Sequence, residues 1–125
     1  MSNPAEQEIA AVSTAPRVTQ ADIEANIVSE VFFTGKEILD GLDEGWPSEI
    51  YGAGKNVEKA EAALKLLTFC VLVLRNGFTV TGESACASPE NFNAEIGRRV
   101  ARANAVQKIW PLLGFLLKEK LHDQA

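Results

Sequence analysis

Arginines close to residue 100 have the type and spacing to bind an anionic ligand. Arg98, Arg99 and Arg102 follow one another closely. An α-helix turns by about 100° per residue. If this segment is a helix, Arg98 and Arg102 share one flank, and Arg99 borders the stripe of apolar residues on that helix. Because guanidinium groups hold phosphate through paired hydrogen bonds, this spacing predicts a phosphate-binding site. The alternative is that Arg98 and Arg102 form ion pairs with Glu95 and with acids of the predicted first helix.

Aromatic and polar residues before these arginines supply the other parts of a nucleotide pocket. Phe78 follows a predicted turn and offers a ring on which a base stacks, and Asn91 offers an amide for a base edge. Ser88 precedes a predicted helix N-terminus, where free backbone amides receive anions. The predicted ligand-binding residues are Arg98, Arg99, Arg102, Phe78, Asn91 and Ser88.

Catalytic and metal-binding patterns are missing from the sequence. It contains no glycine-rich phosphate loop and no serine or cysteine with a plausible histidine partner, because its single histidine is His122. Cys70 and Cys86, with one histidine, are too few for a four-ligand metal site or a disulfide scaffold. We expect a binding protein that is not an enzyme and that uses no metal and no cofactor.

Length, composition and charge predict one domain that does not bind duplex DNA. The 125 residues are 46% hydrophobic and 23% charged, which is typical of a globular domain. We place this domain at residues 19–121, between an N-terminal tail (1–18) and a C-terminal tail (122–125). The net charge of −5 divides into −8 over residues 1–50 and +3 over residues 51–125, so an anion site belongs in the second part. Without a long apolar stretch or a secretory signal, we expect a cytoplasmic protein with no membrane partner.

The first part of the chain predicts one long acidic helix and then a loop. Thr19 and Asp22 approximate a capping box, which starts a helix near Gln20. Apolar residues recur at spacings of four or seven as far as Leu42 and predict one broad buried face. Residues 41–54 are rich in glycine and predict a loop that carries aromatic side chains. The acids on the exposed face of the predicted helix are Asp22, Glu30, Glu37, Asp40 and Glu44.

A short helix and a β-hairpin are predicted next. Residues 57–64 are rich in alanine and glutamate and favour a helix. An apolar run over residues 66–74, an Asn76-Gly77 turn and an alternating segment over residues 78–81 predict two antiparallel strands. The first strand shows no polar alternation, so we expect both of its faces to be covered, the second by another subunit.

A long helix completes the predicted fold. Ser88 and Pro89 suit a helix start, and the apolar stripe that follows reaches Trp110 before Pro111 kinks or breaks the helix. The predicted fold class is therefore α+β. In it, a β-hairpin packs against a long C-terminal helix and an acidic N-terminal helix, and the chain forms a homo-oligomer.

The stretch from Phe69 to Leu117 resembles a family of small accessory proteins of tailed bacteriophages. The matching elements include Asn76-Gly77-Phe78, Gly82 to Cys86, Ser88 to Phe92 and Lys108 to Trp110. This family is catalogued as gp forty-nine or gene sixty-six. The order of strand, hairpin and long helix also looks like the phage sponge proteins that antagonise Thoeris immunity by sequestering a cyclic ADP-ribose signal.

These resemblances imply an anti-defence protein of the host cytoplasm. Its expected function is to bind and sequester a small phosphate-containing immune signal, of the cyclic nucleotide or cyclic ADP-ribose type, without cleaving it. The alternative is an interaction protein whose acidic N-terminal helix blocks a host defence protein or mimics nucleic acid.

Overall fold

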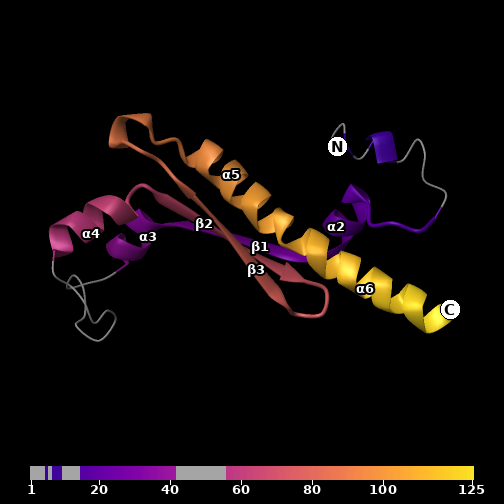
Figure 1. Cartoon of the computed structure of the whole chain (residues 1–125). Coiled ribbons are helices and arrows are strands. Elements are labelled where there is room, and N and C mark those ends of the chain that lie inside the picture. Colours follow the sequence, from indigo (N-terminus) through magenta and orange to yellow (C-terminus); the bar gives the residue numbers. More distant parts are fainter. Residues whose placement is uncertain (1–4, 6, 10–14, 42–55) are drawn as a thin grey trace.

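A computed structural model describes residues 5, 7–9, 15–41 and 56–125 of the chain. The elements form an elongated α+β arrangement in which a three-stranded sheet and a long C-terminal helical region lie side by side (Figure 1). Most of the predicted loop at residues 41–54 and of the predicted N-terminal tail lies outside the described residues. In chain order the elements are α2 (Gln20–Asn26), β1 (Ile27–Thr34), α3 (Gly35–Asp40), α4 (Val57–Leu64), β2 (Leu67–Leu74), β3 (Thr79–Ala85), the 3-10 turn η1 (Pro89–Asn91), α5 (Ala94–Gln107) and α6 (Ile109–Gln124).

The prediction of one long acidic N-terminal helix is wrong. The capping box forms as predicted, since the Asp22 amide donates to Thr19 Oγ1 at 3.1 Å and the Thr19 amide to Asp22 Oδ2 at 2.8 Å. Helix α2 nevertheless ends at Asn26, and Ile27–Thr34 forms strand β1. A spacing of four residues also keeps side chains on one face of a strand, because four is a multiple of two. The β-branched and aromatic residues of this segment favour the strand.

The acids assigned to that helix are instead distributed over separate elements. Glu30 lies on β1, whereas Glu37 lies in the first turn of α3 and forms a second capping box with Thr34. Asp40 accepts a hydrogen bond from Lys36 at 2.6 Å. Glu44 lies outside the described residues, and the carboxylates that the structure describes form no continuous acidic helix face.

The predicted β-hairpin is confirmed and extends further than expected. Strands β2 and β3 pair in an antiparallel register, with Val71 opposite Thr81, and β3 continues as far as Ala85. Gly77 has a φ of 89°, a conformation that glycine adopts at little cost. The Asn76 side chain accepts a hydrogen bond from the Phe78 amide at 2.9 Å and closes the turn. Strand β1 then pairs antiparallel with β2, so that β2 is the central strand.

Helix α5 covers one face of this sheet and forms the core with it. On β2, Thr68, Cys70, Leu72 and Leu74 are buried, and the intervening residues are only half-buried. Within the described residues, no helix crosses the middle of the opposite face (Figure 1). The second cover expected for β2 is therefore not supplied by the described part of the chain. The buried hydrophobic core consists of Ile23, Cys70, Leu72, Leu74, Val80, Ala101, Ala105, Val106 and Ile109.

Helix α5 begins later than predicted and packs through smaller residues. The Asn93 side chain caps it by accepting a hydrogen bond from the Ile96 amide at 3.0 Å, and Ser88 precedes only the η1 turn. Its buried residues are Gly97, Ala101, Ala105 and Val106. Ile96 and Val100 of the predicted stripe are 48% and 40% exposed. At Gly97, Ala101 and Ala105 the helix lies so close to the sheet that larger side chains do not fit between them.

The predicted interruption near Pro111 is present. Helix α5 ends at Gln107, and Pro111 lies in the first turn of α6, where a missing backbone N–H costs no helical hydrogen bond. Ile109 is buried, so this end of α6 is anchored in the core. Helix α6 then continues away from the sheet towards the C-terminus (Figure 1). None of the described helices is long and apolar enough to cross a membrane.

We predict that Gly82→Ala lowers the free energy of unfolding by about 2 kcal/mol, as expected for overpacking. A Cβ at Gly82 would collide with the backbone of Ala101 and Ala105 in α5. Gly114→Ala is the matched control, because a Cβ there meets nothing within 4 Å. In helix α6 this second change is expected to raise stability by about 0.5–1 kcal/mol. Urea unfolding followed by circular dichroism measures both, and equal stability of the two variants contradicts the packing argument.

Candidate functional site

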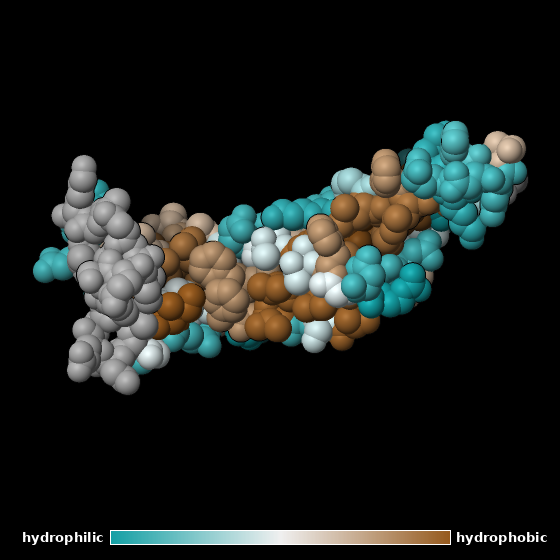
Figure 2. Space-filling model, turned by 90° about the horizontal axis from the view of Figure 1, so that it is seen from below, coloured by the Kyte–Doolittle hydropathy of each residue, from teal (hydrophilic) through white to brown (hydrophobic). Residues whose placement is uncertain are grey.

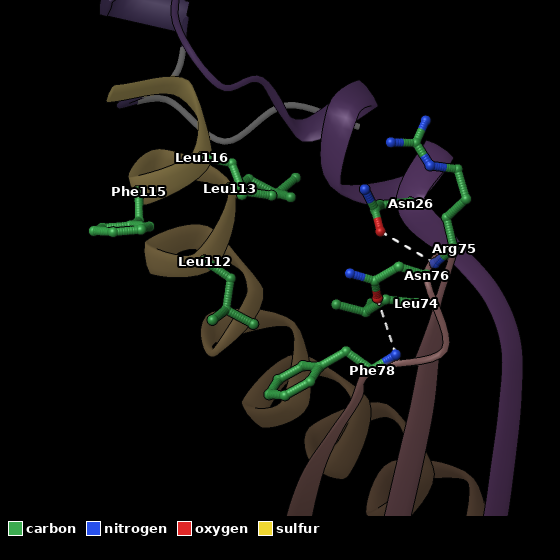
Figure 3. A pocket seen from close by; sticks show the side chains of 9 residues that line it. All are labelled: Asn26, Leu74, Arg75, Asn76, Phe78, Leu112, Leu113, Phe115 and Leu116. Atoms are coloured by element: carbon green, nitrogen blue, oxygen red, sulfur yellow. Dashed lines mark hydrogen bonds between the residues drawn. The ribbon is translucent and has the colours of Figure 1, made fainter. Parts of the chain in front are cut away.

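A pocket of about 270 Å³ opens between the hairpin turn and helix α6. Leu74 comes from the end of β2, Phe78 follows the turn, and the leucines of α6 form the opposite wall (Figure 3). The hairpin end and α6 are separate elements, so the pocket depends on both. Its lining residues are Asn26, Leu74, Arg75, Asn76, Phe78, Leu112, Leu113, Phe115 and Leu116.

The walls of this pocket are mainly apolar and include two accessible aromatic rings. Phe78 is 55% exposed and Phe115 is 66% exposed. Exposed phenylalanine rings beside a concave surface are suited to stack on a flat ligand such as a nucleobase. Phe78 was expected in a ligand site from the sequence, and the structure places it in this pocket.

The polar groups of the pocket present hydrogen-bond donors. Asn76 Oδ1 accepts from the Phe78 amide at 2.9 Å, and Asn26 Oδ1 accepts from the Arg75 amide at 3.3 Å. A backbone N–H requires an acceptor, so these bonds fix which end of each side-chain amide is the oxygen. Within the described part of the chain, the side-chain amino groups of Asn26 and Asn76 donate to no partner. Together with the exposed Arg75 guanidinium, they suit a ligand that carries oxygen acceptors or negative charge.

The other sequence-predicted residues do not join Phe78 in this pocket. Asn91 lines a second hollow at the start of α5, together with Thr68 and Gly97. Thr68 and Leu74 are six residues apart on β2, so the two hollows are separated by about 20 Å. The Ser88 side chain makes no capping hydrogen bond, and its carbonyl oxygen accepts from Cys86 Sγ at 3.1 Å.

Arg102 is engaged in ion pairs that connect three elements. Its Nη1 and Nη2 donate to the Glu24 carboxylate of α2 at 3.1 and 2.7 Å, and its Nε donates to Glu30 Oε1 of β1 at 2.5 Å. Both acids belong to the segment predicted as the first helix, as the alternative interpretation of Arg102 anticipated. The hydrogen bonds from Arg102 lower the pKa of Glu24, and those to Glu24 and Glu30 raise the pKa of Arg102. Arg102 is thus occupied in holding α5 against α2 and β1.

Arg98 and Arg99 remain accessible on α5. Both are exposed, and neither forms an ion pair within the described part of the chain, including with Glu95. Neither lines the hollow that contains Asn91. The structure therefore divides the predicted phosphate-binding group into one paired arginine and two exposed ones.

Sequence reasoning missed most residues of the pocket beside α6. The turn pattern predicts only that Asn76 lies in a turn. Nothing in the sequence indicates that Asn26 contacts Arg75. In the structure, the backbone oxygen of Asn26 accepts a hydrogen bond from the Arg75 amide at 2.9 Å. Phe115 lies among the apolar residues that follow Pro111 in the sequence. The available signal was the run from Arg75 to Phe78, which places a cation, an amide and an aromatic ring beside one turn.

Reactive groups are sparse among the described residues. Burial raises the pKa of the Cys70 thiol, which makes a thiolate nucleophile unfavourable there. No cluster of three or more histidine, cysteine, aspartate or glutamate residues suitable for a metal ion occurs in the ranges that the structure describes. The pocket beside α6 contains no carboxylate, histidine, cysteine or serine side chain.

Fold and pocket together define a small α+β protein with one helix-covered sheet and a donor-lined apolar hollow. Residues 18–121 match the phage protein family described as N4 Gp49/phage Sf6 gene 66, and the chain belongs to this family. The resemblance to phage accessory proteins is thereby confirmed. Comparisons with curated proteins and with solved structures gave no match.

We predict that Arg102→Ala lowers the free energy of unfolding by about 1–2 kcal/mol near neutral pH. This range allows for solvent screening, since the Glu24 and Glu30 side chains are 44% and 39% exposed. The pKa of Glu24 lies below its ordinary value of 4.5 in the folded protein. Its contribution to stability is therefore complete above pH 4.5 and is lost as the pH falls through the folded value.

The same variant is accordingly expected to lose less stability on acidification than the unmodified protein. Urea unfolding at a series of pH values from neutral to about pH 3 measures the difference, with Arg98→Ala as the matched control. If Arg102→Ala and Arg98→Ala show the same pH dependence, the ion pairs contribute nothing measurable.

Proposed function

We propose that this phage protein binds and sequesters a small phosphate-containing immune signal, of the cyclic nucleotide or cyclic ADP-ribose type, without cleaving it. It would act in the host cytoplasm as an anti-defence protein. The observation that carries the proposal is the pocket beside α6, which combines apolar walls and aromatic rings with hydrogen-bond donors. A nucleotide requires these three features together.

Each part of the pocket has a distinct role in this proposal. Phe78 stacks on the base, and the amino groups of Asn26 and Asn76 donate to its carbonyl or ring-nitrogen acceptors. Arg75 neutralises the phosphate. Figure 3 shows the Arg75 side chain extending past Asn26, on the opposite side of the pocket from Leu112. The phosphate is therefore expected at the edge of the pocket and the base among the leucines.

The volume of the pocket limits what it encloses. At about 270 Å³ it is slightly smaller than the range of about 300–1,000 Å³ typical of pockets for whole small molecules. A pocket of this size takes one base with part of its ribose, and the rest of a cyclic ligand remains outside. The ligand is thus expected to contact exposed residues of the hairpin turn as well.

The lining chemistry favours capture over turnover. General acid–base or nucleophilic catalysis needs a titratable or nucleophilic side chain within hydrogen-bond reach of the ligand. The lining residues supply leucine, phenylalanine, asparagine and arginine side chains only. Hydrolysis of a phosphate ester is therefore not expected in this pocket, and the bound signal is released unchanged.

We predict that Phe78→Ala and Arg75→Ala each weaken ligand binding by about 10-fold or more. One stacked base is worth about 1–3 kcal/mol, and a hydrogen bond to a charged group is worth about 1.5–3 kcal/mol. The measurement is a thermal-shift titration against cyclic ADP-ribose isomers and cyclic di- and trinucleotides. Ligand at 100 times its dissociation constant stabilises the native state by about 2.7 kcal/mol. The matched control is the double variant Arg98→Ala with Arg99→Ala, which removes exposed cations from α5.

Each outcome of this titration has a defined meaning. A shift that survives in the control and is lost in Phe78→Ala supports the pocket beside α6. A shift lost only in the control moves the site to Arg98 and Arg99 and leaves the sequestering function in place. Absence of any shift with all nucleotides, or recovery of a cleaved product, overturns the proposed function.

A further inference from the structure

The sheet face opposite α5 is an uncovered surface at the centre of the molecule. The pairing register places Val31 of β1, Val71 of β2 and Thr81 of β3 in one row. Cys70 and Gly82 in the neighbouring row are buried under α5, so the row of Val71 belongs to the other face. Val31 is 49% exposed, and Val71 is only half-buried although it lies on the central strand. We call this surface the outer face.

The outer face is apolar along its length. Leu67, Phe69, Val71 and Val73 alternate along β2, and the ring of Phe69 stacks on that of Phe33 with centroids 5.2 Å apart. Figure 2 shows hydrophobic surface running along one side of the molecule. Over β1, β2 and β3, the register assigns this face Ser29, Val31, Phe33, Leu67, Phe69, Val71, Val73, Thr79, Thr81, Glu83 and Ala85.

The charge of this surface excludes recognition by a strongly charged partner. Glu83 is its only ionisable residue among those that the register assigns to it. Interface cores are similarly depleted of charge, whereas an acidic or basic partner requires complementary groups. A surface with one ionisable residue is also compatible with a copy of itself, because two copies bring at most one pair of like charges together across a two-fold axis. The charge distribution therefore favours self-association.

The dimensions of the outer face match those of a sheet that packs on another sheet. Eight-residue strands about 3.4 Å per residue and about 4.8 Å apart give a flat area of about 27 Å by 14 Å. Two such faces contribute about 800 Å² before the protruding side chains are counted, and specific interfaces begin near 1,000 Å² in total. The flat area of two faces therefore falls just below this threshold, and the protruding side chains raise the buried area towards it.

The small core of the chain indicates which partner is available. Within the described residues, the buried aliphatic side chains of leucine, isoleucine and valine are Ile23, Leu72, Leu74, Val80, Val106 and Ile109. Large hydrophobic side chains that remain exposed are at least as numerous. A partner that covers the outer face and so compensates for the small core must be present whenever the chain folds. A second copy of the chain meets this requirement, because it is made at the same time and in the same amount.

We infer that two copies of this protein pack outer face against outer face and form a two-layered β-sandwich with α5 on each outside surface. Stacked sheets of this kind lie about 10 Å apart with their side chains interdigitated. The inference does not depend on the proposed ligand. The expected homo-oligomer is thereby specified as a dimer, and the outer face is specified as its interface.

Sedimentation equilibrium over a range of protein concentrations tests this inference. The unmodified protein is expected to reach about twice its chain mass of 13.5 kDa at high concentration. Val31→Lys should shift it to the monomer, since it places like charges on both copies of the interface. Val100→Lys is the matched control and should remain dimeric, because Val100 is a valine of similar exposure, 40%, on α5.

A second variant keeps the test independent of folding defects. Thr81→Lys changes an exposed polar residue of the same row on β3 and is expected to produce a monomer with unchanged circular dichroism. An unmodified protein that stays monomeric at high concentration overturns the inference. A dimer that persists in both Val31→Lys and Thr81→Lys also overturns it, because the interface then lies elsewhere. Since mass is measured without ligand, these results are separate from those of the thermal-shift titration.

Discussion

The close approach of helix α5 to strands β2 and β3 is the constraint on which the rest of the fold depends. Gly82 on β3 and Gly97 on α5 are the points of closest contact, and a Cβ at Gly97 would lie 2.6 Å from Thr68 Oγ1. At these points the proximity leaves room only for small side chains, such as those of Ala101 and Ala105. The core is therefore thin, and it lies on one side of the sheet.

The position of α5 also determines how the other elements are held. Arg102 follows the buried Ala101 directly and reaches the carboxylates of Glu24 and Glu30, which connects α5 to α2 and β1. Where α5 ends, the burial of Ile109 directs α6 past the hairpin turn. The pocket lies where α6 and the turn diverge. Ligand-sized space thus arises at the edge of the packed region, where side chains no longer fill the gap between elements.

Local patterns predicted the elements that local interactions determine. The turn at Gly77, the capping box at Thr19 and the short helix α4 depend on neighbours in the sequence, and all were predictable. Strand β1 was misassigned because apolar spacing of four fits both a helix and a strand. Its strand conformation is stabilised by pairing with β2, for example Val31 with Val71, and such a long-range contact leaves no spacing signal in the sequence.

The candidate site was predictable only in part for the same reason. Phe78 was found because the turn before it is a local motif, whereas Asn26 meets Arg75 across 49 positions of sequence. Arg102 was ambiguous because its two partners, Glu24 and Glu30, are 78 and 72 positions away. Residue type indicated that an arginine binds an anion, and only the fold decided that the anion is a carboxylate of the same chain.

The two faces of the sheet have separate roles in this arrangement. Leu74, which lines the pocket, is on the face that α5 covers, and Val71 is on the outer face. Association through the outer face would leave the pocket of each copy open, so a dimer would carry two independent ligand sites. Under the proposed function of stoichiometric capture this geometry would be favourable, because dimerisation would stabilise a thin-cored fold without reducing its capacity for ligand.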